Sequence, residues 1–189
     1  MQPKAIRHCR AVIDSKTDDA NALAFAGFIY ATFASDKDGA FGAAERAIAL
    51  NPNGARVLTN SAMVHVIFGN YETAIEFANR AVQLNPLDPM RYGPECTLSF
   101  CYYHTGRFAD AIEAAVRSIQ SNSKFVHAYS MLAASYVQLD RMNEAETAVR
   151  RLLEIEPSFR ATGFRNAPVG PPDKMDSLIS DLISAGLPE

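Results

Sequence analysis

Apolar and small residues recur along this chain at helical spacing, and short turns separate the runs. The clearest example is the segment 55–86, which divides at Gly69-Asn70 and ends at Pro86. The positions that share a face are Leu58, Ala62, His65 and Val66 in the first run, and Ala74, Phe77, Ala78, Ala81, Val82 and Leu84 in the second. Such spacing predicts amphipathic helices, and proline cannot continue a helix interior. The segment is therefore predicted to form two antiparallel helices joined by a short turn.

The second half of this pattern occurs four times. The copies span residues 40–52, 74–86, 111–123 and 145–157, at steps of 34, 37 and 34 residues. A fixed period of this length indicates one supersecondary unit repeated along the chain, and 34 residues is the period of a helix–turn–helix array. Arrays of this kind present extended binding surfaces, so the period also favours an interaction protein over an enzyme.

Small residues occupy the positions that bring the two helices of each unit together. In the first helix, a small residue is followed three positions later by an aromatic residue or histidine: Gly27 and Tyr30, Ala62 and His65, Ser99 and Tyr102, Ala133 and Tyr136. The equivalent positions of the second helix hold Ala40, Ala44 and Ala47; Ala74, Ala78 and Ala81; Ala111, Ala115 and Ser118; and Ala145, Val149 and Leu152. Small side chains let two helices approach closely. The turns fall at Gly69 and Gly106, with Asp140 in the last unit.

These residues resemble the tetratricopeptide repeat family, whose pattern combines a small residue and an aromatic residue in helix one with an alanine and a terminal proline in helix two. The chain departs from the pattern in lacking tryptophan and in carrying His65 and Ser123 at an aromatic and a proline position. The resemblance implies an all-α fold, a right-handed superhelix of antiparallel helix pairs. The expected parts are a leading half repeat (1–19), four repeats (20–54, 55–88, 89–125 and 126–159), a linker (160–172) and a capping helix (173–186).

The two ends are predicted to differ from the repeats. Residues 4–14 match a second helix without its partner, which indicates either an N-terminal cap or a fragment of a longer polypeptide. At the other end, apolar residues at helical spacing predict an amphipathic capping helix, with Asp173 as its N-cap and Gly186 at its end. Its apolar positions are Met175, Leu178, Ile179, Leu182 and Ile183.

The C-terminal part also resembles the tetratricopeptide region of bacterial adenylate/guanylate cyclase-like proteins and of winged-helix transcriptional regulators. An insertion around Pro89–Pro94 and the closing Gly-Leu-Pro-Glu carry this resemblance. In those proteins the repeats follow an N-terminal effector domain, which this sequence does not contain, so neither cyclase activity nor DNA binding is implied. The resemblance implies a regulatory or oligomerising domain, with the effector domain or a second copy as its partner.

Composition narrows the class of partner. The net charge of −3 on 189 residues leaves no electrostatic footprint for nucleic acid. The most apolar stretch, residues 20–34, is shorter than the ~20 residues that span a bilayer, and the N-terminus has no apolar segment typical of a signal peptide. Cys9, Cys96 and Cys101 are an odd number without framework spacing, which indicates reduced thiols. We expect a cytoplasmic protein that binds neither nucleic acid nor membrane.

Helix one of each repeat lines the concave groove in the tetratricopeptide family, so its projecting residues are the candidate binding site. They are Phe25, Phe28, Arg56, Asn60, Met63, Ile67, Phe100, Tyr103, His104 and His127, with Met131 and Gln138 beside them. One interpretation is a groove for a partner segment with aromatic and methionine anchors. The other is that several of these phenylalanines pack against the next repeat. Arg56 and Asn60 alone make a poor clamp for a terminal carboxylate, which argues against a chaperone-tail receptor.

Arginine occupies one position of the second helix in all four repeats, at Arg46, Arg80, Arg117 and Arg151. These residues could form a ladder on the convex side that meets an acidic partner. The favoured interpretation is local: Glu76–Arg80 and Glu113–Arg117 are i, i+4 pairs that support an exposed helix.

Candidate chemistry is sparse. Cys101, His104 and His127 could in principle hold zinc, but the spacing typical of a zinc site is absent, so no metal or other cofactor is expected. No phosphate loop, nucleophile elbow or His-Glu-x-x-His motif is present. The sequence therefore predicts no catalytic residues and no enzyme activity.

Overall fold

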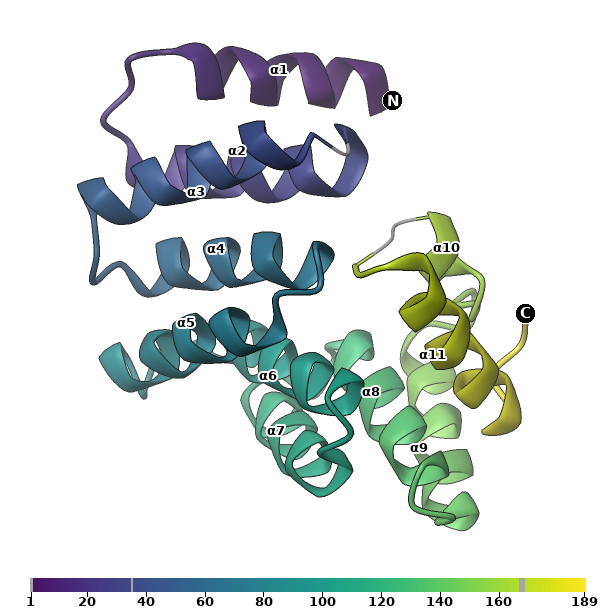
Figure 1. The fold of residues 1–189 in the computed structure, drawn as a ribbon. Helices are drawn as coiled ribbons and strands as arrows, with labels where there is room; N and C mark the ends of the chain where they lie inside the picture. The colour runs from purple at the N-terminus through teal and green to yellow at the C-terminus, as the bar shows by residue number, and fades with distance from the viewer. Residues whose placement is uncertain (1, 35, 167–168) are drawn as a thin grey trace. The chain divides into compact units, whose positions relative to one another are not determined.

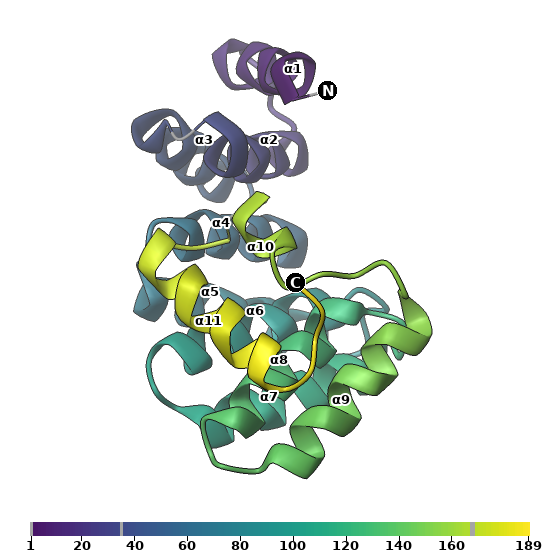
Figure 2. The same cartoon turned by 90° about the vertical axis from the view of Figure 1, so that its right-hand side faces the viewer.

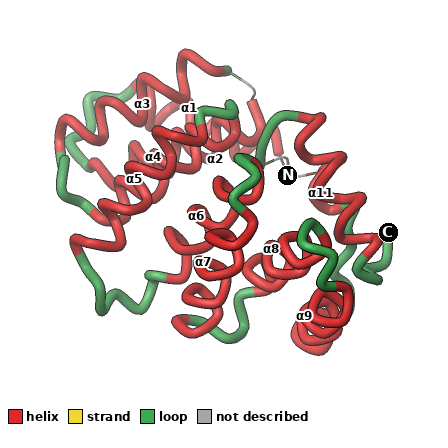
Figure 3. Tube along the Cα trace, turned by 60° about the horizontal axis from the view of Figure 1, so that its bottom comes forward, coloured by secondary structure: helices red, strands yellow, loops and turns green. Residues whose placement is uncertain are grey.

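The computed structural model describes residues 2–34, 36–166 and 169–189, and these residues form helices and connecting segments without a strand (Figure 3). The helices are α1 (Gln2–Asp14), α2 (Ala20–Ala34), α3 (Lys37–Leu50), α4 (Ala55–Ile67), α5 (Tyr71–Leu84), α6 (Tyr92–His104), α7 (Phe108–Ser121), α8 (Val126–Val137), α9 (Met142–Ile155), α10 (Gly163–Asn166) and α11 (Pro172–Ser184) (Figure 1). They divide into two compact units, Met1–Pro86 and Leu87–Glu189. The predicted all-α fold is confirmed.

The first unit contains the leading helix and two helix pairs. Helix α1 packs against α2, α2 pairs with α3, and α4 packs against both α2 and α5 (Figure 1). One buried cluster joins four helices, because Val12 of α1 and Ile48 of α3 pack against Leu23 of α2 and Val57 of α4. The leading helix is therefore part of the core that the first two repeats share.

The second unit contains two more pairs and the C-terminal helices. Helix α6 pairs with α7 and α8 with α9, while α8 also packs against α6 and α7. Helix α11 packs against α8, and the short helix α10 packs against α11 (Figure 2). The predicted linker over 160–172 includes the buried residues Ala161 and Phe164 and the short helix α10.

The predicted small positions lie where helices meet. At Gly27, a Cβ atom would lie 3.2 Å from both the carbonyl oxygen of Ala40 and the Cβ of Ala43, so the backbones of α2 and α3 are in direct contact. Ala62, Ser99 and Ala133 at the equivalent position are fully buried. Close approach of paired helices therefore explains the repeated small residue.

The turns inside the repeats share one geometry. Gly69 and Gly106 have φ of 77°, and Asp140 at the same position has φ of 57°. In each turn the next amide donates to a carbonyl five residues earlier: Asn70 to His65, Arg107 to Tyr102 and Arg141 to Tyr136, at 2.8–2.9 Å. This is the hydrogen bond of a Schellman motif, which favours glycine at the left-handed position. The turn positions predicted from the sequence are confirmed.

The capping helix differs in one detail from its prediction. Its N-cap is Pro171, not Asp173, and Asp173 lies inside the first turn. Proline near a helix start has no unsatisfied N–H and fixes φ, so the helix begins at Pro172 without a side-chain cap. The predicted end is confirmed: Gly186 has φ of 91° and follows the C-cap Ala185.

Among the described residues, no helix is both long enough and apolar enough to cross a lipid bilayer.

Candidate functional site

Four of the predicted binding residues in the first unit are apolar, and all four are at least partly exposed. Phe25 of α2 is 55% exposed, and its ring meets Phe28 edge to face with 6.5 Å between centroids. Phe28 is half-buried and packs against the cluster that contains Val64 of α4. Met63 and Ile67 of α4 are also half-buried. Phe28 thus packs against the next repeat, as the second interpretation predicts, whereas Phe25 is exposed and a groove for a partner segment stays a prediction.

The polar residues of the same set lie nearer the start of α4. Arg56 is exposed and Asn60 is half-buried. His65, at an aromatic position of the repeat, has Phe41 and Phe77 on its two sides, with ring centroids 4.9 and 5.3 Å away. Burial lowers the pKa of His65, so the imidazole acts in this core as a neutral ring.

In the second unit, the predicted inner-face residues lie against the C-terminal segment of the chain. The Tyr103 hydroxyl donates a hydrogen bond to the Asp181 carboxylate of α11, and the Gln138 side-chain amide donates to the same oxygen at 2.7 Å. Asp181 is only 9% exposed and Tyr103 only 4%. Burial and the neighbouring carboxylate raise the pKa of Tyr103, which keeps the phenol protonated as a donor.

Phe100 and His104 are covered by the same segment. Phe100 is 6% exposed, and a Cβ atom on Gly170 would lie 3.6 Å from its ring. The ring centroids of Phe100 and His104 are 4.3 Å apart. Burial, together with the charge of Lys174, lowers the pKa of His104 to about 3. Phe100 is thus buried within the unit, and His104 is half-buried beside it.

His127 lies at the start of α8 and is exposed to solvent. Its ring has Phe125, Phe159 and Phe164 around it, with centroids 5.5 to 6.0 Å away. Desolvation by these apolar neighbours lowers the pKa of His127. No group of three His, Cys, Asp or Glu side chains in the described part of the chain is placed to hold a metal ion.

The four equivalent arginines have different partners. Arg46 donates to the carbonyls of Ile13, Ser15 and Thr17 at 2.7–3.2 Å. Arg80 donates to the carbonyl of Pro52 at 3.0 Å. The side chains of Arg117 and Arg151 pair with carboxylates, those of Glu95 and Glu154 respectively. The predicted Glu113–Arg117 pair is present at 3.8 Å.

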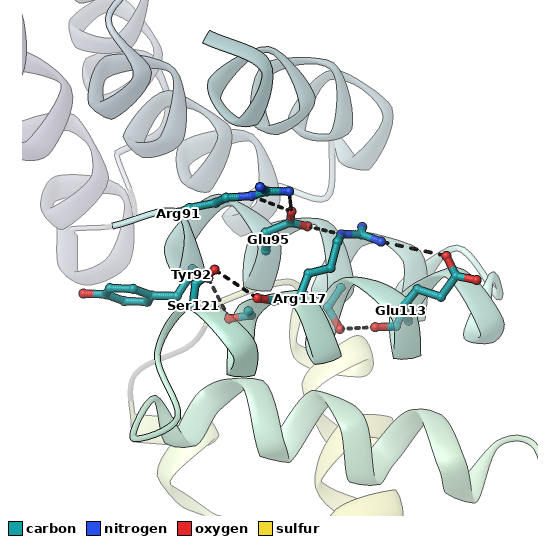
Figure 4. Close-up of polar contacts among 9 residues, drawn as sticks. Arg91, Tyr92, Glu95, Glu113, Arg117 and Ser121 are labelled. Carbon is teal, nitrogen blue, oxygen red and sulfur yellow. Dashed lines mark hydrogen bonds and ion pairs between the residues drawn. The ribbon is translucent and has the colours of Figure 1, made fainter. Parts of the chain in front are cut away.

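Glu95 is a buried charged residue that the sequence did not single out. Its side chain is 1% exposed and lies between two guanidinium groups, with Arg91 and Arg117 each 2.9 Å from a carboxylate oxygen (Figure 4). Arg91 donates to Oε1 through two nitrogens, the second being Nε at 3.1 Å, and Arg117 donates to Oε2, so both carboxylate oxygens are paired. The Arg91–Glu95 spacing of four residues is the one sequence signal that could have indicated this pair.

Comparison with family models agrees with the resemblance drawn from the sequence. Residues 29–89 match the family model described as tetratricopeptide repeat. The match supports the tetratricopeptide resemblance for this part of the chain. Residues 67–152 match a second model, described as anaphase-promoting complex, cyclosome, subunit 3. Together the matched segments run from within α2 to within α9 and leave α1, α10 and α11 outside.

Curated proteins share part of the repeat region. Human serine/threonine-protein phosphatase 5 is 30% identical over 88 residues, which are 47% of this chain and 17% of the phosphatase. The chain therefore spans only a small part of the length of the curated relatives it matches. These matches do not reach cyclase-like proteins or winged-helix regulators, so that resemblance stays a prediction.

Solved structures share the fold. PilW, a type IV pilus biogenesis factor, superposes with a TM-score of 0.73 at 16% identity, over 98% of this chain and 81% of PilW. MamA gives 0.60 at 20% identity, over 84% and 91%. The first tetratricopeptide domain of Spaghetti (RPAP3), bound to the HSP90 peptide SRMEEVD, gives 0.53 at 20% identity, over 70% and 90%. At these identities the likeness concerns the tetratricopeptide fold.

Proposed function

We propose that this chain is a non-catalytic protein-interaction module, and that a segment of another protein binds along the α2/α4 face of the first unit. The observation that carries the proposal is Phe25, a large aromatic side chain that is 55% exposed beside Phe28. Burial of such a ring by a partner would remove a large apolar area from water, and aromatic anchors of this kind dominate binding energies.

The chemistry of this face favours an apolar segment. Phe25, Met63 and Ile67 offer aromatic, thioether and aliphatic surface, and methionine adapts to irregular partners. Arg56 is exposed at the start of α4 and can pair with one acidic group at the rim. A related fold, the RPAP3 domain, holds an HSP90 peptide, which supports peptide binding as the general activity.

The experiment begins with the full chain immobilised against a library of random peptides. A selected peptide is then titrated by fluorescence anisotropy against wild type, Phe25→Ala and Leu50→Ala. Leu50 is the matched control, because it is a large apolar residue of the same unit with 42% exposure but lies at the end of α3. We expect Phe25→Ala to weaken binding about tenfold or more and Leu50→Ala to leave it unchanged. Equal affinity for all three proteins would place the binding site elsewhere.

A second arm uses the peptide SRMEEVD, which ends in a free carboxylate. Because Arg56 and Asn60 do not form a converging set of charged donors, we expect no saturable binding of this peptide below about 1 mM. Micromolar affinity that Arg56→Ala abolishes would show that this face is a carboxylate clamp after all. A regulatory or oligomerising role in a larger bacterial protein, and a cytoplasmic location, stay predictions from the sequence.

A further inference from the structure

Helix α11 sits on the second unit in the way that a helical ligand sits in a groove. Its buried side comprises Met175, Leu178, Ile179 and Leu182, each at most 2% exposed. These positions are i, i+3, i+4 and i+7 of one helix face, the spacing by which an amphipathic helix fills an apolar groove. Helix α11 packs mainly against α8 (Figure 2).

The polar contact within this apolar interface is specific. Asp181, at i+6 from Met175, places its carboxylate where the Tyr103 hydroxyl and the Gln138 amide both donate to one oxygen. Tyr103 belongs to α6 and Gln138 follows α8 as its C-cap, so residues of two successive repeats donate hydrogen bonds to the same carboxylate. A carboxylate buried here without hydrogen-bond donors would destabilise the fold, because burial removes its hydration. The Tyr103 hydroxyl and the Gln138 amide replace that hydration, so they favour an acidic residue at this position.

The receptor residues are those of an inner face. Phe100, Tyr103, His104 and Gln138 occupy the positions that the repeat pattern assigns to binding, and each is part of, or next to, the surface that the C-terminal segment covers. A Cβ atom on Gly170 would lie 3.6 Å from the Phe100 ring, and 2.9 Å from the methyl group of Met175 in the same segment. The start of the C-terminal segment therefore packs on Phe100.

We propose that the α6/α8 face is a receptor for an amphipathic helix with apolar residues at i, i+3, i+4 and i+7 and an aspartate at i+6, and that α11 is its resident occupant. A partner helix with the same pattern binds this face by displacing α11. The proposal deepens the interaction function proposed above, but it concerns the second unit and a helical, aspartate-bearing ligand.

The probe is a fluorescein-labelled peptide with the sequence of residues 171–187. It is titrated against the full chain and against a full-chain variant, Leu178→Ala/Leu182→Ala, whose own α11 is weakened while the receptor face is intact. We expect the variant to bind the peptide at least about tenfold more tightly than wild type, because the internal competitor is weakened. The proposal would be overturned if the two proteins bound the peptide with equal affinity, or if both bound it weakly or not at all.

The carboxylate is tested with a double-mutant cycle. In the Leu178→Ala/Leu182→Ala background, adding Tyr103→Phe should weaken the peptide that carries Asp181 but not a peptide with Asp181→Asn. A peptide with scrambled sequence and the same composition is the control, and it should not bind. If Tyr103→Phe weakened the binding of both peptides equally, the Tyr103 contact would not depend on the carboxylate of the ligand, and the proposal would fail.

Hydrogen exchange on the unaltered protein keeps the proposal testable if the variant unfolds. A displaceable helix must open without unfolding of the repeats, so α11 amides should exchange faster than those of α8. Exchange of both helices at one common rate would show that α11 is an integral part of the core and would overturn the proposal. Retained binding at the Phe25 face in that case would leave the function proposed for the first unit intact.

Discussion

Arg46 acts on the carboxyl end of α1. The last carbonyls of a helix have no partner inside it, and the end carries partial negative charge. Ile13 belongs to the last turn of α1, and Ser15 and Thr17 follow it, so the guanidinium satisfies three carbonyls that would otherwise depend on water. One side chain therefore fixes the leading helix to α3.

We expect Arg46→Ala to lower the free energy of unfolding by about 2 kcal/mol, because charge-assisted hydrogen bonds are lost at a helix end. Arg80→Ala is the matched control: it removes the same residue from the same position of the next repeat, but Arg80 is exposed and reaches a single carbonyl. Its effect should stay below about 1 kcal/mol. Urea denaturation followed by circular dichroism measures both, and equal effects would contradict the assignment.

In the second unit, we expect a substitution of Glu95 to lower the free energy of unfolding more than Arg46→Ala does in the first. Removing the charge with Glu95→Gln leaves two guanidinium groups without their shared carboxylate, and breaking one partner of a buried ion pair is strongly destabilising. Since Arg91 and Arg117 are 29% and 39% exposed, water compensates in part, and we expect a loss of about 2–3 kcal/mol.

The control for this prediction is Glu113→Gln. Glu113 faces the same Arg117 at 3.8 Å but is 74% exposed, so its removal should leave the urea midpoint nearly unchanged (Figure 4). If Glu95→Gln and Glu113→Gln were equally stable, the desolvation penalty of the buried Glu95 carboxylate would equal the stabilisation from its ion pairs.

At the scale of the helices, glycine stabilises the turns but destabilises the helix interiors. Gly106 has φ of 77° in a turn, whereas Gly42 lies inside α3, where a Cβ atom would have nothing within 4 Å. Gly106→Ala should destabilise the chain by about 1–2 kcal/mol, because the left-handed conformation strains any Cβ. Gly42→Ala should stabilise it by about 0.5–1 kcal/mol through helix propensity. Thermal unfolding should therefore shift in opposite directions, and shifts of the same sign would contradict the turn geometry.

The packing around His104 makes the second unit sensitive to acid. The pKa of His104 falls from its usual 6.5 to about 3 because burial and Lys174 disfavour the imidazolium. Between these two values the unfolded chain binds a proton that the folded chain does not, so stability is complete above pH 6.5 and declines as the pH falls toward 3. For one proton the slope is at most about 1.4 kcal/mol per pH unit, and the partial exposure of the ring reduces it.

His104→Gln tests this effect. We expect the loss of stability between pH 7.5 and pH 5.0 to be smaller in the variant than in wild type, by about 1 kcal/mol. His65 and His127 also have lowered pKa values and act in both proteins, so they cancel in the difference. Parallel stability curves for the two proteins would show that His104 is protonated without cost in the folded state.

At the scale of the whole chain, the connection between α5 and α6 separates the two units. Leu87 is 91% exposed and Met90 48%, and no helix includes the segment 85–91. The connection between α9 and α11 differs, because Ala161 and Phe164 are buried and the Ala161 amide donates to the Pro188 carbonyl at 2.9 Å.

Brief digestion of the native chain with proteinase K should therefore cut first between residues 85 and 91. Exposed connections with few buried contacts are the preferred sites of proteolysis. Mass spectrometry of the first products identifies the cut. An initial cut within residues 160–165 would contradict this ranking.

The architecture was predictable because its determinants are local and periodic. Gly27 and Ala62 mark helix contacts, and Gly69 marks a turn, from residue type and spacing alone. The N-cap of α11 was predicted wrongly. Asp173 and Pro172 are both acceptable near a helix start, and the sequence alone does not fix the residue at which the helix begins.

The candidate site was less predictable because its exposure depends on contacts between distant segments. Phe25 and Phe100 occupy inner-face positions of their repeats, yet one is 55% exposed and the other 6%. The difference comes from the C-terminal segment, which brings Gly170 against Phe100 and Asp181 against Tyr103. Periodicity predicts the face of a helix but does not predict which other segment covers it.

The varied partners of the repeated arginine limit how these repeats can be rearranged. The 89–125 repeat carries Glu95 together with Arg117, so a duplicated copy would bring its own charge pair. The 20–54 repeat depends on its predecessor, because Arg46 needs the carbonyls at the end of α1. Repeats that are alike in their packing residues thus differ in their arginine contacts: the carboxylate that pairs with Arg117 lies in the same repeat, whereas the carbonyls that accept from Arg46 lie in the segment before its repeat.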